Sequence, residues 1–160
     1  MPKNAPKKQS PKTGTNKRST ARLAAVQALY QMDVGGTTLK TTLEQFTAHH
    51  LGSEVEGEQY LPADADFFHQ IVAGVIDAQL EIDPIIDASL TDKWPVSRID
   101  ATLRAIMRAA SFELLRRKDI PANVVITEYV DVAKAFFEDD APGMVNAVLD
   151  AIAKKTGPAQ

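Results

Sequence analysis

The sequence of 160 residues contains no cysteine, a single tryptophan and only 6% aromatic residues. Without cysteine the chain has neither disulfides nor thiolates for catalysis or zinc binding, as is typical of cytoplasmic proteins. No apolar run approaches the length of about 20 residues that a membrane-spanning helix needs. The polar, basic N-terminus also lacks the apolar segment of a secretory signal. We therefore expect a cytoplasmic protein with no membrane partner.

Motifs of catalysis and metal binding are missing as well. The sequence has no phosphate-binding loop, no G-x-G-x-x-G and no G-x-S-x-G. The three histidines, His49, His50 and His69, do not have the i, i+4 spacing of a helical metal site, so we expect surface histidines. These absences predict a protein that is not an enzyme and that binds no cofactor and no metal.

Two carboxylates lie on or beside apolar helix faces, namely Glu113 and Glu128. A buried carboxylate can act as a general acid, but pairing with an arginine across a helical bundle is far more common. We therefore predict structural ion pairs for both residues, with Arg104 and Arg108 as candidate partners.

Acidic residues are absent from the first 22 positions. Residues 1–22 carry seven of the 18 basic residues. Residues 23–160 carry the other 11 together with all 21 acidic residues, so their net charge is −10. Residues 1–17 hold three prolines and no large apolar residue beyond Met1, so we expect a disordered basic arm. A basic arm on an acidic body predicts contact with a polyanion at one end, although a solubilising tail has the same composition.

Helical periodicity runs through the rest of the chain and is strongest between Ile99 and Leu115. Apolar residues recur there at steps of four and three, at Ile99, Leu103, Ile106, Ala110 and Leu114. Asp100 in the first turn and Arg116 in the last turn suit the helix dipole. Two more apolar helices follow at once, which predicts that this helix lies at the centre of a bundle.

Other helices are expected from a start at Ser19 or Thr20 to about Val34, and over about 38–51, 64–80, 84–90, 122–137 and 141–155. The fourth of these seven is a short helix that restarts at Pro84. Residues 52–62 are expected to form an exposed loop. No segment alternates with period two, so the predicted fold class is all-α, with about seven helices in one domain (18–155). Its two packed helical subdomains are expected at about 18–94 and 95–155.

Basic side chains crowd the start of the first helix, at Lys17, Arg18 and Arg22. Arg18 and Arg22 are i, i+4 neighbours and are expected to project from one side, with Val26 and Leu29 buried on the opposite side. Together with the exposed N–H groups of a helix start, these cations predict a phosphate-binding site.

Two further features agree with an RNA ligand. The lysine-rich arm would add counterion release to the binding energy. Tyr30 can stack on an unpaired base, although an aromatic residue at the end of an apolar stripe also fits a place in the core.

Three segments carry a family resemblance: ARLAAVQALY (21–30), LRAIMRAASFELL (103–115) and the tail 120–154 with its V-N-x-V-L-D motif. They resemble the NusB family of bacterial transcription antitermination factors over nearly everything from Arg18 to Lys155. The resemblance implies a fold of two three-helix groups without enzymatic activity. It also implies pairing with NusE, a small-subunit ribosomal protein, to bind single-stranded boxA RNA. The pair would join other Nus factors on RNA polymerase and support read-through of ribosomal RNA operons, and some family members form homodimers.

The resemblance also implies site residues. The family's arginine-rich start corresponds to Arg18 through Arg22, and Ser19 and Thr20 stand where relatives often have arginine. Asp100 and Arg104 correspond to positions near the NusE surface, although helix capping and core pairing explain these two residues as well.

A second RNA-proximal segment of the family corresponds to Asp140, Met144 and Asn146. Relatives commonly have phenylalanine at the position of Met144, and methionine can also pack on a base. Two alternatives remain: a helical protein–protein adaptor without specific RNA binding, and an accessory domain related to RNA methyltransferases. The chain has no βαβ pattern or glycine-rich cofactor loop, which argues against the second.

Overall fold

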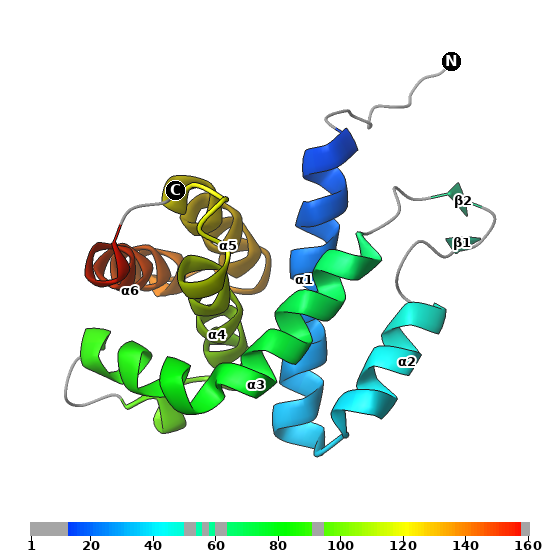
Figure 1. The fold of residues 1–160 in the computed structure, drawn as a ribbon, viewed down its shortest axis with the longest axis horizontal. Helices are drawn as coiled ribbons and strands as arrows, with labels where there is room; N and C mark the ends of the chain where they lie inside the picture. The colour runs from blue at the N-terminus through cyan, green and yellow to red at the C-terminus, as the bar shows by residue number, and fades with distance from the viewer. Residues whose placement is uncertain (1–12, 50–53, 56–57, 60–63, 91–94, 158–160) are drawn as a thin grey trace.

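The computed structural model describes residues 13–49, 54–55, 58–59, 64–90 and 95–157. These residues form six α-helices, which are α1 (Thr13–Gly35), α2 (Leu39–His49), α3 (Ala65–Ser89), α4 (Ala101–Arg116), α5 (Ala122–Phe136) and α6 (Ala141–Thr156) (Figure 1). A 3-10 turn, η1 (Val96–Arg98), precedes α4. The expected loop holds a small antiparallel hairpin of β1 (Glu54–Val55) and β2 (Glu58–Gln59). The prediction of an all-α fold is confirmed.

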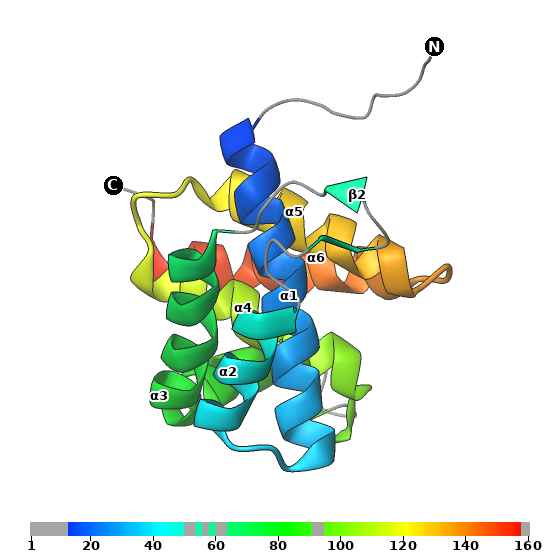
Figure 2. The ribbon, with the colours of Figure 1, turned by 90° about the vertical axis from the view of Figure 1, so that its right-hand side faces the viewer.

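Helix α4 lies at the centre of the bundle, as its apolar pattern predicts. It contacts α1, α3, α5 and α6, whereas α2 packs on the outside against α1 and α3 (Figures 1 and 2). The apolar residues of the predicted stripe are all buried, at Ile99, Leu103, Ile106, Ala110 and Leu114. Their removal from water is the main favourable term that holds the helices around α4.

Aspartates begin two of the helices by capping their free N–H groups. Asp100 Oδ1 accepts a hydrogen bond from Leu103 N at 3.3 Å, and Asp64 Oδ1 accepts one from Phe67 N at 3.0 Å. Such caps satisfy donors that have no partner within the helix. The backbone N–H of Asp64 also donates to the carbonyl oxygen of Lys17 at 3.2 Å. This bond joins the start of α3 to the first turns of α1.

The expected restart at Pro84 is wrong, because α3 continues through it as a single helix. Proline lacks an N–H and leaves the carbonyl oxygen four residues earlier, on Leu80, without its helical donor. Pro84 is exposed and Leu80 is 95% exposed, so this carbonyl lies on the solvent side, where water can satisfy it. The described residues therefore contain one α-helix fewer than the seven expected.

The start of the first helix also differs from the prediction. Helix α1 begins at Thr13 rather than at Ser19 or Thr20, and Ser19 Oγ donates to Glu128 Oε1 at 2.6 Å instead of capping α1. Residues 13–17 of the expected disordered arm therefore lie in α1. Residues 1–12 of that arm and residue 94 at the expected subdomain boundary lie outside the described residues. Among the helices in the described ranges, none has the length and apolar character needed to cross a membrane.

Candidate nucleic-acid interface

The exposed cations of α1 lie near its N-terminal end. Lys17 is exposed, and the side chain of Arg18 is 40% exposed. The guanidinium carbon of Arg18 lies 4.7 Å from the centroid of the Phe67 ring, and its Nε lies 3.9 Å from Asp64 Oδ2. Arg18 thus stacks on an aromatic ring and forms only a long ion pair with a carboxylate. This leaves guanidinium N–H donors available to an anion.

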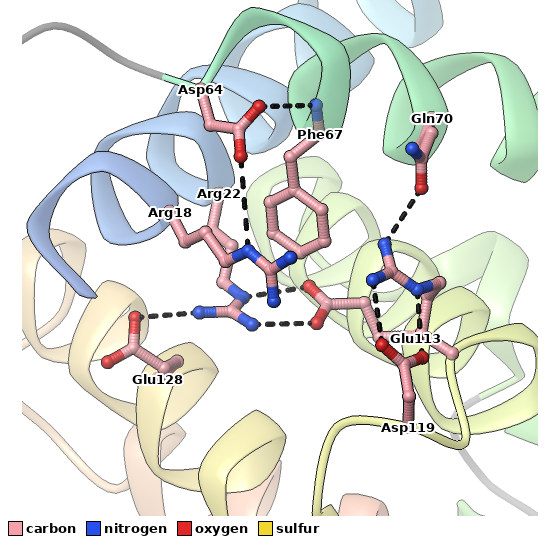
Figure 3. Close-up of polar contacts among 9 residues, drawn as sticks. Arg18, Arg22, Asp64, Phe67, Gln70, Glu113, Asp119 and Glu128 are labelled. Carbon is pink, nitrogen blue, oxygen red and sulfur yellow. Dashed lines mark hydrogen bonds and ion pairs between the residues drawn. The ribbon is translucent and has the colours of Figure 1, made fainter. Parts of the chain in front are cut away.

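Arg22 does not face solvent, and the expectation that it projects beside Arg18 on a free surface is wrong. Its side chain is 3% exposed. Its Nε and NH2 donate to the two carboxylate oxygens of Glu113 at 2.8 and 2.9 Å, and its NH1 donates to Glu128 at 3.1 Å (Figure 3). Arg22 therefore joins α1 to α4 and α5.

The physical reason is the helical period. Val26 and Leu29 follow Arg22 by four and seven residues, so all three share one face rather than opposite faces. That face is the buried one, since Val26 is 1% and Leu29 5% exposed. A buried guanidinium is stable here only because carboxylates meet it.

The buried carboxylate of Glu113 is fully satisfied by this arrangement. Besides its two bonds from Arg22, it accepts a hydrogen bond from Tyr129 Oη at 2.6 Å. Burial alone would lower the pKa of Arg22, but hydrogen bonding to Glu113 and its charge outweigh that effect and raise it. The predicted ion pairing of Glu113 and Glu128 is confirmed, although both pair with Arg22 rather than with Arg104 or Arg108.

Arg104 and Asp100 both form hydrogen bonds with backbone groups at the start of α4. Arg104 Nε donates to Asp33 Oδ2 at 2.8 Å, and its NH1 donates to the carbonyl oxygen of Ile99 at 3.0 Å. Asp100 is exposed and caps α4. Arg108 forms a two-bond pair with Asp83. The structure thus gives Asp100 and Arg104 structural contacts, and their proximity to a partner protein remains a prediction.

Tyr30 lies on the surface rather than in the core, with 42% of its area exposed. It lines an open hollow of about 460 Å³ between α1 and α2, together with Gln27, Gln31, Val34, Gly35 and Phe46. Polar amides and an aromatic face around a hollow are suited to an unpaired base, which stacks and forms hydrogen bonds at its edge.

The second predicted segment lies at the start of α6. Asp140 and Asn146 are exposed, whereas Met144 is half-buried and packs against the core. Helix α6 packs mainly on α3, α4 and α5, whereas α1 packs on α2, α3, α4 and α5. The structure therefore places Lys17 and Arg18 on α1, whereas the second predicted segment lies at the start of α6.

Sequence reasoning missed Arg117 and Phe67. The guanidinium carbons of Arg18, Arg22 and Arg117 lie 4.7, 5.0 and 5.3 Å from the centroid of the Phe67 ring. Phe67 fitted an apolar stripe and Arg117 fitted the basic end of a helix, so each residue had a sufficient local explanation. Only the run Arg116-Arg117-Lys118 signalled a second basic region.

Among the three histidines, only His69 has a side chain that the structure describes. His69 Nε2 lies 3.2 Å from Thr47 Oγ1 at the surface. His50 lies outside the described residues, as does the side chain of His49. Within the part of the chain that the structure describes, no three potential metal ligands gather in one place.

Comparison with known proteins decides the family. A family model described as NusB family matches residues 19–154. The transcription antitermination protein NusB of Rhodopseudomonas palustris (strain TIE-1) is 60% identical over 151 residues, which cover 93% of this chain and 87% of that protein. The chain belongs to the NusB family.

Solved structures agree with membership of the NusB family. T. maritima NusB has a TM-score of 0.71 and 28% identity, over 94% of this chain and 95% of that chain. A chain from a crystal structure of antitermination factors NusB and NusE in complex with dsRNA has a TM-score of 0.71 and 24% identity, over 88% and 98% of the two chains. At that identity the second likeness shows the fold alone. The resemblance read from the sequence is confirmed.

Proposed function

We propose that this NusB-family chain is a non-enzymatic, cytoplasmic transcription antitermination factor that binds single-stranded RNA at the start of α1. The observation that carries the proposal is the placement of Lys17 and Arg18. Lys17 is exposed, and the guanidinium of Arg18 lies over the Phe67 ring, with 40% of the Arg18 side chain exposed. A fixed guanidinium loses little conformational freedom when it binds a phosphate, and it can offer two parallel N–H bonds.

Arg22 serves this site as a positioning residue. Its bonds to Glu113 and Glu128 fix the first turns of α1 against α4 and α5. The backbone bond from Asp64 to Lys17 fixes the same turns against α3. RNA phosphates would therefore meet cations on a rigid scaffold, and the lysines of the arm ahead of α1 would add counterion release.

We propose contacts with RNA bases at two other places. Tyr30 offers its exposed ring in the hollow between α1 and α2 for stacking. Asp140, Met144 and Asn146 at the start of α6 form the second RNA-proximal segment that the family resemblance implies. Stacking on aromatic side chains is how many proteins hold unpaired bases.

The proposed assembly pairs this chain with NusE on a boxA-like RNA, together with other Nus factors and RNA polymerase, to support read-through of ribosomal RNA operons. Its support is the family membership and the fold shared with a chain from a crystal structure of NusB and NusE in complex with dsRNA. A second protein is also expected from the small number of exposed cations on this chain. Each phosphate contact on a single strand contributes a salt slope of only about −0.7, so a few contacts alone give modest binding. A partner that extends the basic surface would raise the affinity and read more bases. Asp100 and Arg104 are the residues proposed to lie near NusE.

The test is the affinity for a short single-stranded boxA-like RNA, measured by fluorescence anisotropy over a series of salt concentrations, with and without NusE. The double variant Lys17→Gln/Arg18→Gln is expected to bind more weakly and to flatten the salt slope by about 1.4, the contribution of two phosphate contacts. The control variant Lys40→Gln/Lys154→Gln removes two exposed cations from other helices. If both variants gave the same affinity and slope, RNA binding at the start of α1 would be refuted. Addition of NusE is expected to tighten binding by the wild-type chain.

A further inference from the structure

Arg117, at the end of α4, lies beside Arg18 although the two are far apart in the sequence. Both guanidinium groups lie over the Phe67 ring, at 4.7 Å for Arg18 and 5.3 Å for Arg117. Both cations therefore contact one aromatic side chain of α3, Arg18 from α1 and Arg117 from the end of α4. One stretch of a nucleic-acid strand can reach both cations.

Arg117 differs from Arg18 in having a strongly engaged carboxylate partner. Asp119 accepts hydrogen bonds from Arg117 Nε at 3.0 Å and from Arg117 NH2 at 2.9 Å. The remaining arm of the guanidinium, NH1, donates to Gln70 Oε1 at 2.8 Å. Asp119 thus forms a bidentate pair with the Nε and NH2 groups of Arg117. Arginine can bind a phosphate through the same two-donor edge.

Asp119 is the more exposed partner in its ion pair with Arg117. The side chain of Asp119 is 63% exposed, whereas that of Arg117 is 19% exposed. The hydrogen bonds from Arg117 lower the pKa of Asp119, and the charge of Arg18 lowers it further, so the carboxylate is ionised at neutral pH.

We propose that Arg117 is a second phosphate contact for single-stranded RNA, and that Asp119 occupies its two-donor edge until a phosphate replaces it. The inference rests on the proposed RNA binding at Arg18 and extends it across Phe67 to the end of α4. The phosphodiester would accept the two bonds that Asp119 gives up, while Gln70 and the Phe67 ring keep the guanidinium in place. Asp119 thereby competes with the phosphate for Arg117 and lowers the affinity of the protein for RNA.

Burial decides which of the arginines around Phe67 can exchange its partner. An exposed ion pair contributes little to stability because water and salt screen it, so a phosphate can replace Asp119 at small cost. Arg22 is in the opposite situation, since its partner Glu113 is 0% exposed and cannot move into solvent. The structure thus separates one fixed guanidinium from two that a ligand can engage.

A double-mutant cycle on the full chain tests this inference with the same labelled single-stranded RNA over a salt series. Asp119→Asn is expected to tighten binding by up to about fivefold, the factor equivalent to one exposed ion pair. Arg117→Ala is expected to weaken binding and to flatten the salt slope by about 0.7. In the Arg117→Ala background, Asp119→Asn should change the affinity no more than the control variant Asp150→Asn does. Asp150 is an exposed, lysine-paired aspartate on α6. Thermal melts of all the variants confirm that each is folded.

Two results would overturn the inference while RNA binding at Arg18 stands. The first is an unchanged salt slope in Arg117→Ala, which would show that Arg117 contacts no phosphate. The second is equal tightening by Asp119→Asn with and without Arg117, which would reduce the role of Asp119 to general charge repulsion. If the wild-type chain bound no RNA in this assay, alone or with NusE, the proposed function itself would fail, and this inference would fail with it.

Discussion

Replacement of Arg22 by alanine is expected to destabilise the fold strongly. The variant removes three hydrogen bonds and leaves the carboxylate of Glu113, 0% exposed, with only the hydroxyl of Tyr129 as a hydrogen-bond partner among those described here. Removal of one partner from a buried ion pair costs about 3–5 kcal/mol because the other charge stays buried. For a chain of this length, each kcal/mol lowers the melting temperature by about 2–4 °C, so a decrease of roughly 6–20 °C is expected.

The assay is thermal and urea unfolding followed by circular dichroism. Arg18→Ala is the matched control, because it removes the same side chain one turn earlier, where the ion pair is exposed and long. We expect that control to cost less than about 1 kcal/mol. A double variant, Arg22→Met/Glu113→Leu, removes both charges and should recover much of the stability lost in Arg22→Ala. Equal melting of Arg22→Ala and Arg18→Ala would refute the structural role of Arg22.

Two further predictions concern the core around α4. Burial and the charge of Glu113 raise the pKa of Tyr129 well above its usual value, so the folded state keeps this proton while the unfolded state loses it above about pH 10. Stability is therefore expected to fall by about 1.4 kcal/mol per pH unit above pH 10 through this group, and urea titrations between about pH 9 and pH 11 should show a shallower fall for Tyr129→Phe than for the wild type. Ile106→Ala is expected to cost about 2–5 kcal/mol in the same unfolding assay, because Ile106 is fully buried on the central helix, and a cost under 1 kcal/mol would contradict that place.

Local patterns were sufficient to predict most of the fold. The apolar period of Ile99–Leu115 placed α4 at the centre, and Asp64 and Asp100 marked the starts of α3 and α4, where the structure shows their caps. Pro84 was misread because a local rule treats proline as a break, whereas an exposed position lets the helix continue. Propensity alone cannot tell which side of a helix will face water.

The candidate site was less predictable because its contacts join distant parts of the chain. Arg22 and Glu113 are 91 residues apart, so no local window contains the pair. The usable signal was the spacing of Arg22 with Val26 and Leu29, which puts a cation on an apolar face. A charge on such a face requires a buried counter-charge. Glu113 is the carboxylate that likewise lies on an apolar face, that of α4.

Three guanidinium groups around the Phe67 ring have different roles because their carboxylates differ in exposure. Arg22 is held by fully and mostly buried carboxylates, so its pair is part of the fold and cannot exchange with solutes. Arg18 and Arg117 meet Asp64 and Asp119, whose side chains are 34% and 63% exposed, and water weakens both pairs. The buried pair joins α1 to α4, and these two helices carry Arg18 and Arg117. In the proposed RNA complex, a polyanion would replace only the screened contacts, so binding there would not require the helices to move apart.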